Sequence, residues 1–502
     1  MPRQVPDQQI SRLNRYVADW LGLHFPKKRW RDLERIIIHA APELGFQAVD
    51  ECIERLVAGE FSAHQANTLA GRLTIGETYF FREQNSFDFL EHRILADLIA
   101  ARRGRDQRLR IWSAGCSTGE EPYSLAIILN RLLPDIRDWQ VTILATDINT
   151  QALARAGQGL YREWSFRGVP EPIRQRYFTM TAEGLFELSY AIRTMVTFAV
   201  LNLAEDSYPS LSTNTNAMDV IFCRNVLMYF EPRCQQQVIS GFHRSLLDNG
   251  WLIVSPCEVS PAFSRYFDTV MFPGGFVYRK GGRGTKPQPS VLGELSGTVL
   301  PVPLPSEQVA PPLLSVSPKQ PAQQKRRQVP ASPESSCAEA LALYRQGRYD
   351  EAAAVLSRVL ECPAADNRPQ FGKAAILLAQ SLANQGKIAP ALEWTERAIA
   401  VDKLNAELYY LRATIQQEQG AEPQAIATLR QALYLDPNFV LAHFALATLT
   451  LREKPGEADR HFENALALLG ACGVDDPVPG ADGMTAGRLV EVIASTRESM
   501  KH

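Results

Sequence analysis

The sequence predicts an α/β protein with three structured parts: a small N-terminal helical domain, a Rossmann-like domain with a β-hairpin insertion, and a C-terminal all-α repeat solenoid. Apolar residues recur at helical spacing over 8–85, where almost no strand pattern occurs. Short β-rich runs then alternate with helical runs over 109–280, which is typical of a mainly parallel sheet covered on both faces. A helical repeat begins at Cys337. At 502 residues, the chain is long enough for two or three domains.

Composition excludes several classes of protein. The formal net charge of −2 gives no global basic field that would favour nucleic acid. The eight cysteines form no C-x-x-C motif and no Cys/His pair at zinc spacing, so we expect reduced thiols and no metal site. The first residues lack the apolar core of a signal peptide, and no run of 18 apolar residues occurs. We therefore expect a soluble, cytoplasmic protein that neither inserts into a membrane nor binds nucleic acid.

The first domain, which we expect at 1–85, is predicted from a helical stripe. Ile10, Leu13, Val17 and Leu21 recur at spacings of three and four residues, so they fall on one face of a helix.

The second domain, which we expect at 86–282, contains five predicted strands and three predicted helices. The strands are LRIWSA (109–114), VTILATD (141–147), VTFAVLNL (196–203), DVIFC (219–223) and WLIVS (251–255). The helices are EPYSLAIILNRLL (121–133), NTQALARAGQGLY (149–161) and PRCQQQVISGFHRSLL (232–247). Strand-like alternation around Glu183 and Gly184 predicts the hairpin insertion, at about 174–200.

The segment 283–335 is rich in Pro, Ser and Gln and has too few aromatic residues to build a core. This composition predicts a flexible linker. The repeat domain is then not needed to build a site in the domains that precede it.

The repeats, which we expect at 336–470, align on one small residue in each second helix. These residues are Ala352, Ala391, Ala425 and Ala458, at steps of 39, 34 and 33. Glycine occupies the turn between paired helices at Gly347, Gly386 and Gly420. A period near 34 resembles the tetratricopeptide repeat, which implies a protein partner; a plain helical bundle is the alternative. We expect 471–502 to be a capping helix or tail.

A glycine-bearing loop follows the first predicted strand. Gly115 and Gly119 lie four residues apart, whereas a dinucleotide fingerprint places its first two glycines two apart. Glu120 and Glu121 then open the helix at the place where a pyrophosphate needs bare N–H groups. Carboxylates there suit a cationic, phosphate-free ligand such as S-adenosylmethionine, and Asp147 can accept two ribose hydroxyls. An unliganded α/β turn is the alternative.

Two further motifs flank the glycine loop and the segment ATDIN, which contains Asp147. TIGETYFFRE (74–83) precedes the glycine loop, and DVIFCRNVLMYF (219–230) follows ATDIN (145–149). In order and spacing these four motifs resemble the chemotaxis receptor methyltransferases, the CheR family, over roughly Gln8 to Arg279. The resemblance implies transfer of a methyl group from S-adenosylmethionine to glutamate side chains of a methyl-accepting chemoreceptor, leaving S-adenosylhomocysteine.

The resemblance also implies roles for individual residues. Arg82 and Tyr229 match the catalytic positions, with Arg82 beside the sulfur of the methyl donor and Tyr229 in the acceptor pocket. The cofactor-binding positions are matched by Gly76, Thr78, Arg82, Glu120, Asp147, Asn202, Leu203, Arg224 and Asn225. Glu121 is the alternative to Glu120, and Gly76 stands where many relatives have Asn. Aromatic and leucine residues beside these positions, Phe80, Phe81, Leu227 and Phe230, are expected in the core.

Methyl transfer to a carboxylate needs no strong general base, because the carboxylate is already ionised at neutral pH. Catalysis then depends on positioning and on excluding water. The absence of a Ser/His/Asp motif in the sequence agrees with that chemistry.

Two stretches are rich in basic residues. In PKKRWRDLERI (26–36), cationic side chains recur at helical spacings on one face, and they are predicted to bind the glutamate-bearing helices of a receptor: Lys27, Lys28, Arg31 and Arg35. A merely solvated charged face is the alternative. ARRGRDQRLR (101–110) is predicted to be a solvated connector.

Three other functions are alternatives to this interpretation. A DNA amino-methyltransferase is disfavoured, because CRNVLMYF replaces the D/N-P-P-Y motif. A small-molecule carboxyl methyltransferase would explain neither the basic segment nor the repeats. A cofactor-sensing scaffold with weak or no transferase activity is the third alternative.

Overall fold

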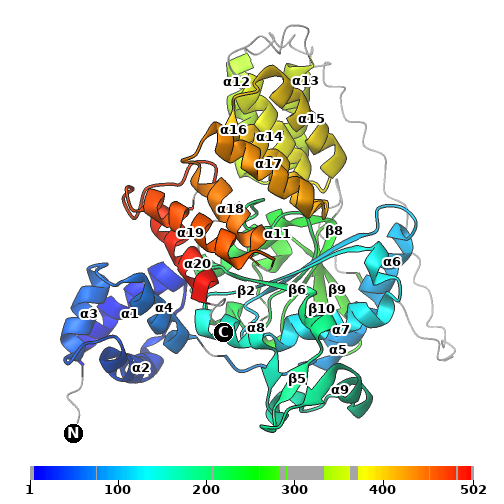
Figure 1. Ribbon diagram of the computed structural model, residues 1–502. Helices are drawn as coiled ribbons and strands as arrows, with labels where there is room; N and C mark the ends of the chain where they lie inside the picture. Colours follow the sequence, from blue (N-terminus) through cyan, green and yellow to red (C-terminus); the bar gives the residue numbers. More distant parts are fainter. Residues whose placement is uncertain are drawn as a thin grey trace, which may run out of the picture.

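The N-terminal part of the protein is a cluster of helices that stands beside the α/β part in the computed structural model (Figure 1). The structure describes residues 5–74, 76–204, 208–258, 260–281, 290–291, 333–361, 371–451, 453–481 and 484–498. The helices of this cluster are α1 (Asp7–Leu21), η1 (Lys27–Arg29), α2 (Trp30–Glu43), α3 (Val49–Val57) and α4 (Ala63–Leu73). The predicted stripe of α1 is buried, including Leu13 and Val17 with no exposed surface. Ser62 and Gln65 form a capping box that begins α4.

An eight-stranded sheet forms the centre of the molecule, in the order β11-β9-β10-β8-β7-β1-β2-β6. The strands are β1 (Arg108–Ala114), β2 (Gln140–Asp147), β6 (Val196–Val200), β7 (Met218–Phe222), β8 (Leu246–Ile253), β9 (Asp268–Phe272), β10 (Gly275–Arg279) and β11 (Ser290–Val291). The five predicted strands are therefore confirmed. The β9–β10 pair and β11 were not predicted.

Both faces of the sheet are covered, as predicted. Ile111 belongs to the hydrophobic cluster that packs under α7 (Glu120–Leu132), whereas the next residue, Trp112, packs on the opposite face against α11 (Pro232–Ser245). Alternate side chains of a strand point to opposite faces, so β1 is buried on both. The remaining predicted helix, between these two in the sequence, is α8 (Thr150–Gln158).

The predicted hairpin insertion is a separate small sheet with the order β3-β5-β4. Its strands are β3 (Leu160–Tyr161), β4 (Phe178–Met180) and β5 (Phe186–Leu188). It thus includes a strand before the expected range of 174–200, and 196–200 belongs to the main sheet. The remaining short helices are α5 (Gln84–Phe89), η2 (Leu90–Leu95), α6 (Ala96–Arg102), η3 (Ile136–Asp138), η4 (Glu163–Phe166), α9 (Glu171–Tyr177), α10 (Tyr190–Arg193), η5 (Leu227–Tyr229), η6 (Pro256–Glu258) and η7 (Phe263–Arg265).

The C-terminal part is a stack of antiparallel helix pairs. The helices are α12 (Pro333–Arg345), α13 (Tyr349–Leu360), α14 (Phe371–Asn384), α15 (Ile388–Val401), α16 (Ala406–Glu418), α17 (Glu422–Leu435), α18 (Val440–Thr450), α19 (Pro455–Leu469) and α20 (Ala486–Glu498). The four aligned alanines have no exposed surface. Gly347, Gly386 and Gly420 have φ of 75, 72 and 72°, a left-handed backbone that glycine adopts without steric cost at helix ends.

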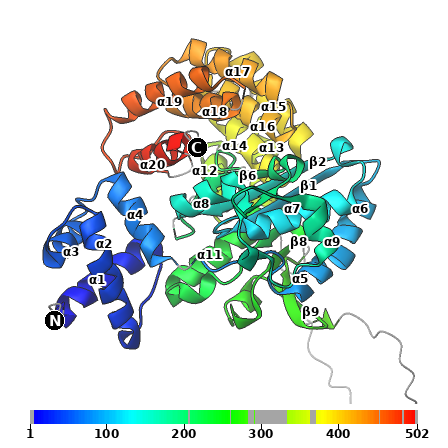
Figure 2. The same ribbon diagram turned by 60° about the horizontal axis from the view of Figure 1, so that its bottom comes forward.

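The repeats are packed against the α/β part, which the sequence did not predict. Arg108 Nη2 donates to Glu418 Oε2 over 3.0 Å, and both side chains are buried. Asn216 Nδ2 donates to the other oxygen of Glu418 over 2.6 Å. Helix α20 contacts both β6 and α4, and Figure 2 shows it between the repeats and the N-terminal cluster. All of the predicted linker except 290–291 and 333–335 lies outside the described residues.

The prediction that 101–110 is a solvated connector holds for the exposed turn at 103–106 and is wrong for 108–110, which begin β1. Arg108 and Arg110 are 7% and 2% exposed, because β1 is an interior strand and the repeats cover its beginning. Arg102 donates to both oxygens of Asp219 on β7.

Within the described residues, no helix has the length and apolarity to cross a membrane.

Candidate functional site

A cavity of about 190 Å³ lies where β1, β2 and β7 end, and residues of the N-terminal cluster close its other side. Open α/β sheets bind ligands outside the carboxyl ends of their strands. Predicted site residues meet on its wall: Gly76, Thr78, Arg82, Asp147, Asn202, Leu203, Arg224, Asn225 and Tyr229.

The glycine loop after β1 requires both of its glycines. Gly115 has a φ of 82°, and a Cβ there would lie 2.4 Å from Cγ2 of Val226. Gly119 has a φ of 91°, and a Cβ there would lie 2.9 Å from Cβ of Ala156. The loop therefore combines a left-handed backbone with close packing, which only glycine allows.

Asp147 ends β2 and is held by the backbone of the glycine loop. Its Oδ2 accepts from Ser117 N over 2.8 Å, and its Oδ1 accepts from Asn149 N over 2.8 Å. Burial raises the pKa of Asp147, and these backbone hydrogen bonds oppose the rise. Each oxygen keeps further acceptor capacity toward the cavity.

The two acids that begin α7 point in different directions. Glu121 is on the cavity wall, where its Oε1 accepts from the Ser113 hydroxyl over 2.7 Å. Glu120 is outside the lining, and its carboxylate accepts from the hydroxyls of Thr118 and Ser165. Burial raises the pKa of both carboxyls. The assignment of the cofactor-binding acid to Glu120 stays a prediction, and the lining favours Glu121.

Arg224 joins the two motifs that surround the cavity. Its side chain is only 2% exposed, and its Nη2 lies 2.9 Å from Oε2 of Glu83. It also donates to the backbone carbonyl of Arg82 and lies 3.5 Å from the Glu121 carboxylate. A buried guanidinium with these partners fixes the Arg82 segment against β7.

Arg82 is aimed by an unusual backbone. Phe81 and Glu83, on either side of it, have φ of 55 and 58°. Such φ values cost ~1–3 kcal/mol for residues with a Cβ and persist only where the surroundings hold them. Phe81 N donates to the Ser124 hydroxyl over 3.0 Å, and Arg82 Nη1 donates to the Glu77 carbonyl over 2.6 Å.

The small sheet holds the same segment through Phe80. The Phe80 ring is 1% exposed and packs against Tyr161 and Phe178, at centroid distances of 4.8 and 5.0 Å. Phe80 N donates to the Ser165 carbonyl over 3.0 Å. The expected core role of Phe80 therefore agrees with its packing.

Arg167 is a functional candidate that the sequence analysis missed. Its guanidinium lies between the rings of Tyr79 and Trp164, 3.9 and 4.1 Å from their centroids. Its Nη2 also lies 3.0 Å from the Glu77 carboxylate. It braces the Arg82 segment through Tyr79 and Glu77, which line the cavity, but no motif distinguishes it.

Glu258 was also missed. It is 2% exposed and accepts from the backbone N–H groups of Asn225 and Val226, over 2.8 and 2.7 Å. Burial raises its pKa, and these hydrogen bonds oppose the rise. Asn225 has a φ of 60°, so Glu258 holds a left-handed turn in the cavity wall. In the sequence, Glu258 could have been identified only as an acidic residue shortly after a predicted buried strand.

Three of the lining residues connect the site to the N-terminal cluster. Asn202 Nδ2 donates to the Trp20 carbonyl over 2.8 Å, and the Tyr229 carbonyl accepts from His24 N over 2.9 Å. At Gly76, a Cβ would lie 3.2 Å from the Ser117 hydroxyl oxygen, which donates to the Gly76 carbonyl. A small residue at this position therefore suits the local packing.

The four predicted receptor-binding cations lie outside the cavity lining. Lys27 and Lys28 belong to the short helix η1, whereas Arg31 and Arg35 are one turn apart on α2. All four are exposed. In the described part of the chain none of them forms an ion pair within 4 Å, although Arg29 beside them pairs with Asp32.

No group of three or more His, Cys, Asp or Glu side chains is arranged to hold a metal ion within the described residues. None of the described cysteines forms a disulfide.

Comparison with known proteins gives the family. Residues 76–274 match the CheR methyltransferase, SAM binding domain, and residues 406–439 match a tetratricopeptide repeat. A chemotaxis protein methyltransferase 2 of Vibrio cholerae is 33% identical over 289 residues, covering 57% of this chain and 97% of that protein. A chemotaxis protein methyltransferase of Borreliella burgdorferi is 30% identical over 256 residues, covering 51% of this chain and 89% of that protein.

Another relative extends into the repeats. A probable biofilm formation methyltransferase, WspC, of Pseudomonas aeruginosa is 28% identical over 440 residues, covering 87% of this chain and 93% of that protein. With the cavity at the strand ends and the four motifs around it, these matches are conclusive for the family. The chain belongs to the CheR family of chemotaxis protein methyltransferases, with an S-adenosylmethionine-binding domain and C-terminal tetratricopeptide repeats.

Proposed function

We propose that the chain is a protein-glutamate O-methyltransferase that acts on the cytoplasmic helices of a methyl-accepting chemoreceptor and forms glutamate methyl esters. The observation that carries the proposal is that Arg82, Asp147 and Tyr229, from three separate segments, line one cavity. Membership of the chemotaxis methyltransferases supports the same substrate class.

The cavity wall fits S-adenosylmethionine. Asp147 can accept the two ribose hydroxyls, because its backbone partners leave acceptor capacity on both oxygens. Carboxylates beside the cavity suit a ligand with a positively charged sulfonium. The proposed cofactor-binding residues are Gly76, Thr78, Arg82, Glu120, Asp147, Asn202, Leu203, Arg224 and Asn225, with Glu121 as the alternative to Glu120.

The proposed mechanism depends on positioning. S-adenosylmethionine, when bound, supplies an electrophilic methyl group. Arg82 orients the acceptor carboxylate, and Tyr229 lines the pocket into which that carboxylate enters. Because the acceptor is ionised at neutral pH, the protein needs to align and desolvate it rather than deprotonate it.

The exposed cations of η1 and α2 are proposed to bind the receptor. Lys27, Lys28, Arg31 and Arg35 have no carboxylate partner among the described residues, so they can pair with glutamates on a receptor helix. Complementary charge of this kind chiefly increases the rate of encounter and sets the register of docking.

Incubation with methyl-labelled S-adenosylmethionine and an isolated receptor cytoplasmic fragment tests the proposal. We expect label in the fragment that base releases as methanol, and none with a fragment whose methylation-site glutamates are changed to glutamine. Cofactor binding by calorimetry without any label transfer would instead indicate a sensing scaffold. Label on small carboxylic acids alone would indicate a small-molecule enzyme.

A further inference from the structure

We propose that the cleft between β6 and the repeats binds an extended segment of a partner protein, which adds to the main sheet as a strand beside β6. This site is separate from the cofactor cavity and does not depend on the proposed methylation of receptors.

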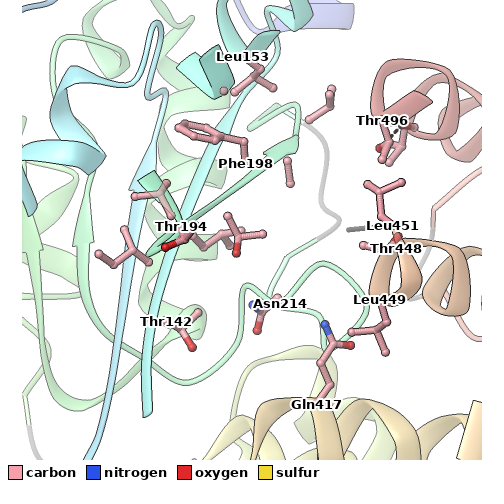
Figure 3. A pocket seen from close by; sticks show the side chains of 18 of the residues that line it. Thr142, Leu153, Thr194, Phe198, Asn214, Gln417, Thr448, Leu449, Leu451 and Thr496 are labelled. Carbon is pink, nitrogen blue, oxygen red and sulfur yellow. Dashed lines mark hydrogen bonds between the residues drawn. The ribbon is translucent and has the colours of Figure 1, made fainter. Parts of the chain in front are cut away.

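The cleft has a volume of about 2160 Å³. The strand side is formed by β2 and by every residue from Thr194 to Leu201, and the opposite side is formed by α16, α17, α18 and α20. Figure 3 shows Thr194 and Phe198 on the strand side, with Gln417, Thr448 and Leu451 across the open space.

Strand β6 is an unpaired edge that faces this space. Among the described strands it pairs only with β2, in parallel register. Leu201 N donates to the Asp147 carbonyl on the β2 side. Since main-chain groups alternate in direction along a strand, Thr197 and Ala199 also face β2, and Val196, Phe198 and Val200 direct their N–H and C=O groups into the cleft.

The sequence of β6 carries none of the usual devices that protect an edge. Val196–Val200 reads VTFAV, which has high β-propensity and contains no proline, glycine or charged residue. The strand has no bulge in its register with β2. Such an edge is a template for another strand. Helix α20 contacts β6 but adds no strand to it, and the open space of the cleft reaches every residue from Thr194 to Leu201.

The charges of the cleft favour a weakly charged occupant. Five basic and five acidic side chains line the cleft, so its net charge is close to zero. Some of them form ion pairs: Glu418 with Arg108, Arg430 with Glu457, and Arg193 with Glu187. Uncharged polar side chains such as Gln417 and Thr448 are exposed between them. A strand with main-chain hydrogen bonds to β6 and few charges therefore complements both walls.

The test uses the full chain and linear twelve-residue peptides displayed on phage. Panning on the immobilised protein in the presence of excess soluble Gln417→Trp variant removes peptides that bind elsewhere, because the larger side chain obstructs the cleft wall on which Gln417 lies. Gln419→Trp is the matched control, since Gln419 is exposed two residues away and does not line the cleft. Thr448→Trp obstructs the same repeat wall from α18 and is the second variant, should Gln417→Trp unfold.

Selected peptides should bind the wild type and Gln419→Trp equally, and at least about tenfold more weakly to Gln417→Trp and Thr448→Trp. N-methylation of alternate peptide amides should weaken binding at least about tenfold in one alternate set and little in the other, because only one edge of an added strand bonds to β6. Bound peptide should slow hydrogen exchange at Phe198 and Val200.

Three results of the peptide experiments would overturn the proposal. They are recovery of no peptide, equal sensitivity to both N-methylation sets, and unchanged exchange at Phe198 and Val200. Concentration-dependent dimerisation that Gln417→Trp abolishes, without any peptide binding, would assign the cleft to a second copy of the chain and would also overturn it.

Discussion

The two basic stretches of this chain have opposite surroundings. In 26–36, Lys27, Lys28, Arg31 and Arg35 are exposed and have no carboxylate partner within the described residues. In 101–110, Arg108 is buried against Glu418, which lies 310 residues further along the chain, and Arg102 is bound to Asp219.

The difference lies in the partners rather than in the cations. A guanidinium is buried only where a carboxylate and further hydrogen-bonding groups compensate its lost hydration. Exposed cations remain available to another molecule. The comparison therefore predicts loss of stability when a partner in the second stretch is removed, and loss of substrate binding when the first stretch is changed.

The largest effect should follow from breaking the buried pair. Glu418→Ala leaves Arg108 and Asn216 without their acceptor, and we expect the free energy of unfolding to fall by about 3–5 kcal/mol. Glu418→Gln should lose less, because it keeps an acceptor oxygen. Denaturant unfolding measures the loss. Glu422→Ala, at an exposed position on α17, is the control; a loss of similar size there would contradict the comparison.

In burial and pairing, Arg82 is intermediate between Arg108 and the exposed cations of 26–36. It is half-buried, and its guanidinium donates to the Glu77 carbonyl rather than to a carboxylate. Arg82→Ala should reduce methyl transfer about 10²-fold or more by removing a positioning and charge-stabilising group. Single-turnover assays with methyl-labelled cofactor measure this effect. Turnover near that of the wild type, in a variant whose unfolding is unchanged, would remove Arg82 from the site.

Asp147 extends the comparison to a carboxylate whose partners are backbone amides. Asp147→Ala should weaken S-adenosylmethionine and S-adenosylhomocysteine alike by about 1.5–3 kcal/mol, because a charged acceptor of ribose hydroxyls is lost. Titration calorimetry with S-adenosylhomocysteine measures the change without turnover. If the affinity is unchanged, the ribose is held elsewhere.

The smallest effect is expected in the exposed stretch. Changing Lys27, Lys28, Arg31 and Arg35 together to glutamate should raise the KM for a receptor fragment by about tenfold at low salt, and the difference should shrink as salt screens exposed charges. Cofactor affinity and unfolding should not change. Arg105→Glu, an exposed position in the other stretch, is the control. A KM that is insensitive to all four changes would leave these residues as a merely solvated face.

Much of the fold was predictable because it is determined by local patterns. The period of the apolar residues identified β1, β2 and the helix α7, and the aligned alanines with Gly347 and Gly420 identified the repeats. The candidate site was predictable because its residues sit in motifs on loops that follow strands, and parallel strands bring such loops to one edge of a sheet.

Other features needed the tertiary structure. Arg167 and Glu258 lie in no motif, and their roles appear only from what they contact: the ring of Tyr79 and the backbone of Asn225. Likewise, either acid at the start of α7 satisfied the pattern, and only the packing placed Glu121 rather than Glu120 on the cavity wall.

By itself, the sequence determined the order of the secondary-structure elements, the family and the loops that surround the cofactor cavity, because periodicity and motif spacing act over short distances along the chain. Tertiary structure alone decided that the repeats pack on the sheet, that Arg108 is buried and that the edge of β6 faces a cleft. The physical reason is that burial and pairing depend on groups hundreds of residues apart, and no local pattern encodes which of them meet.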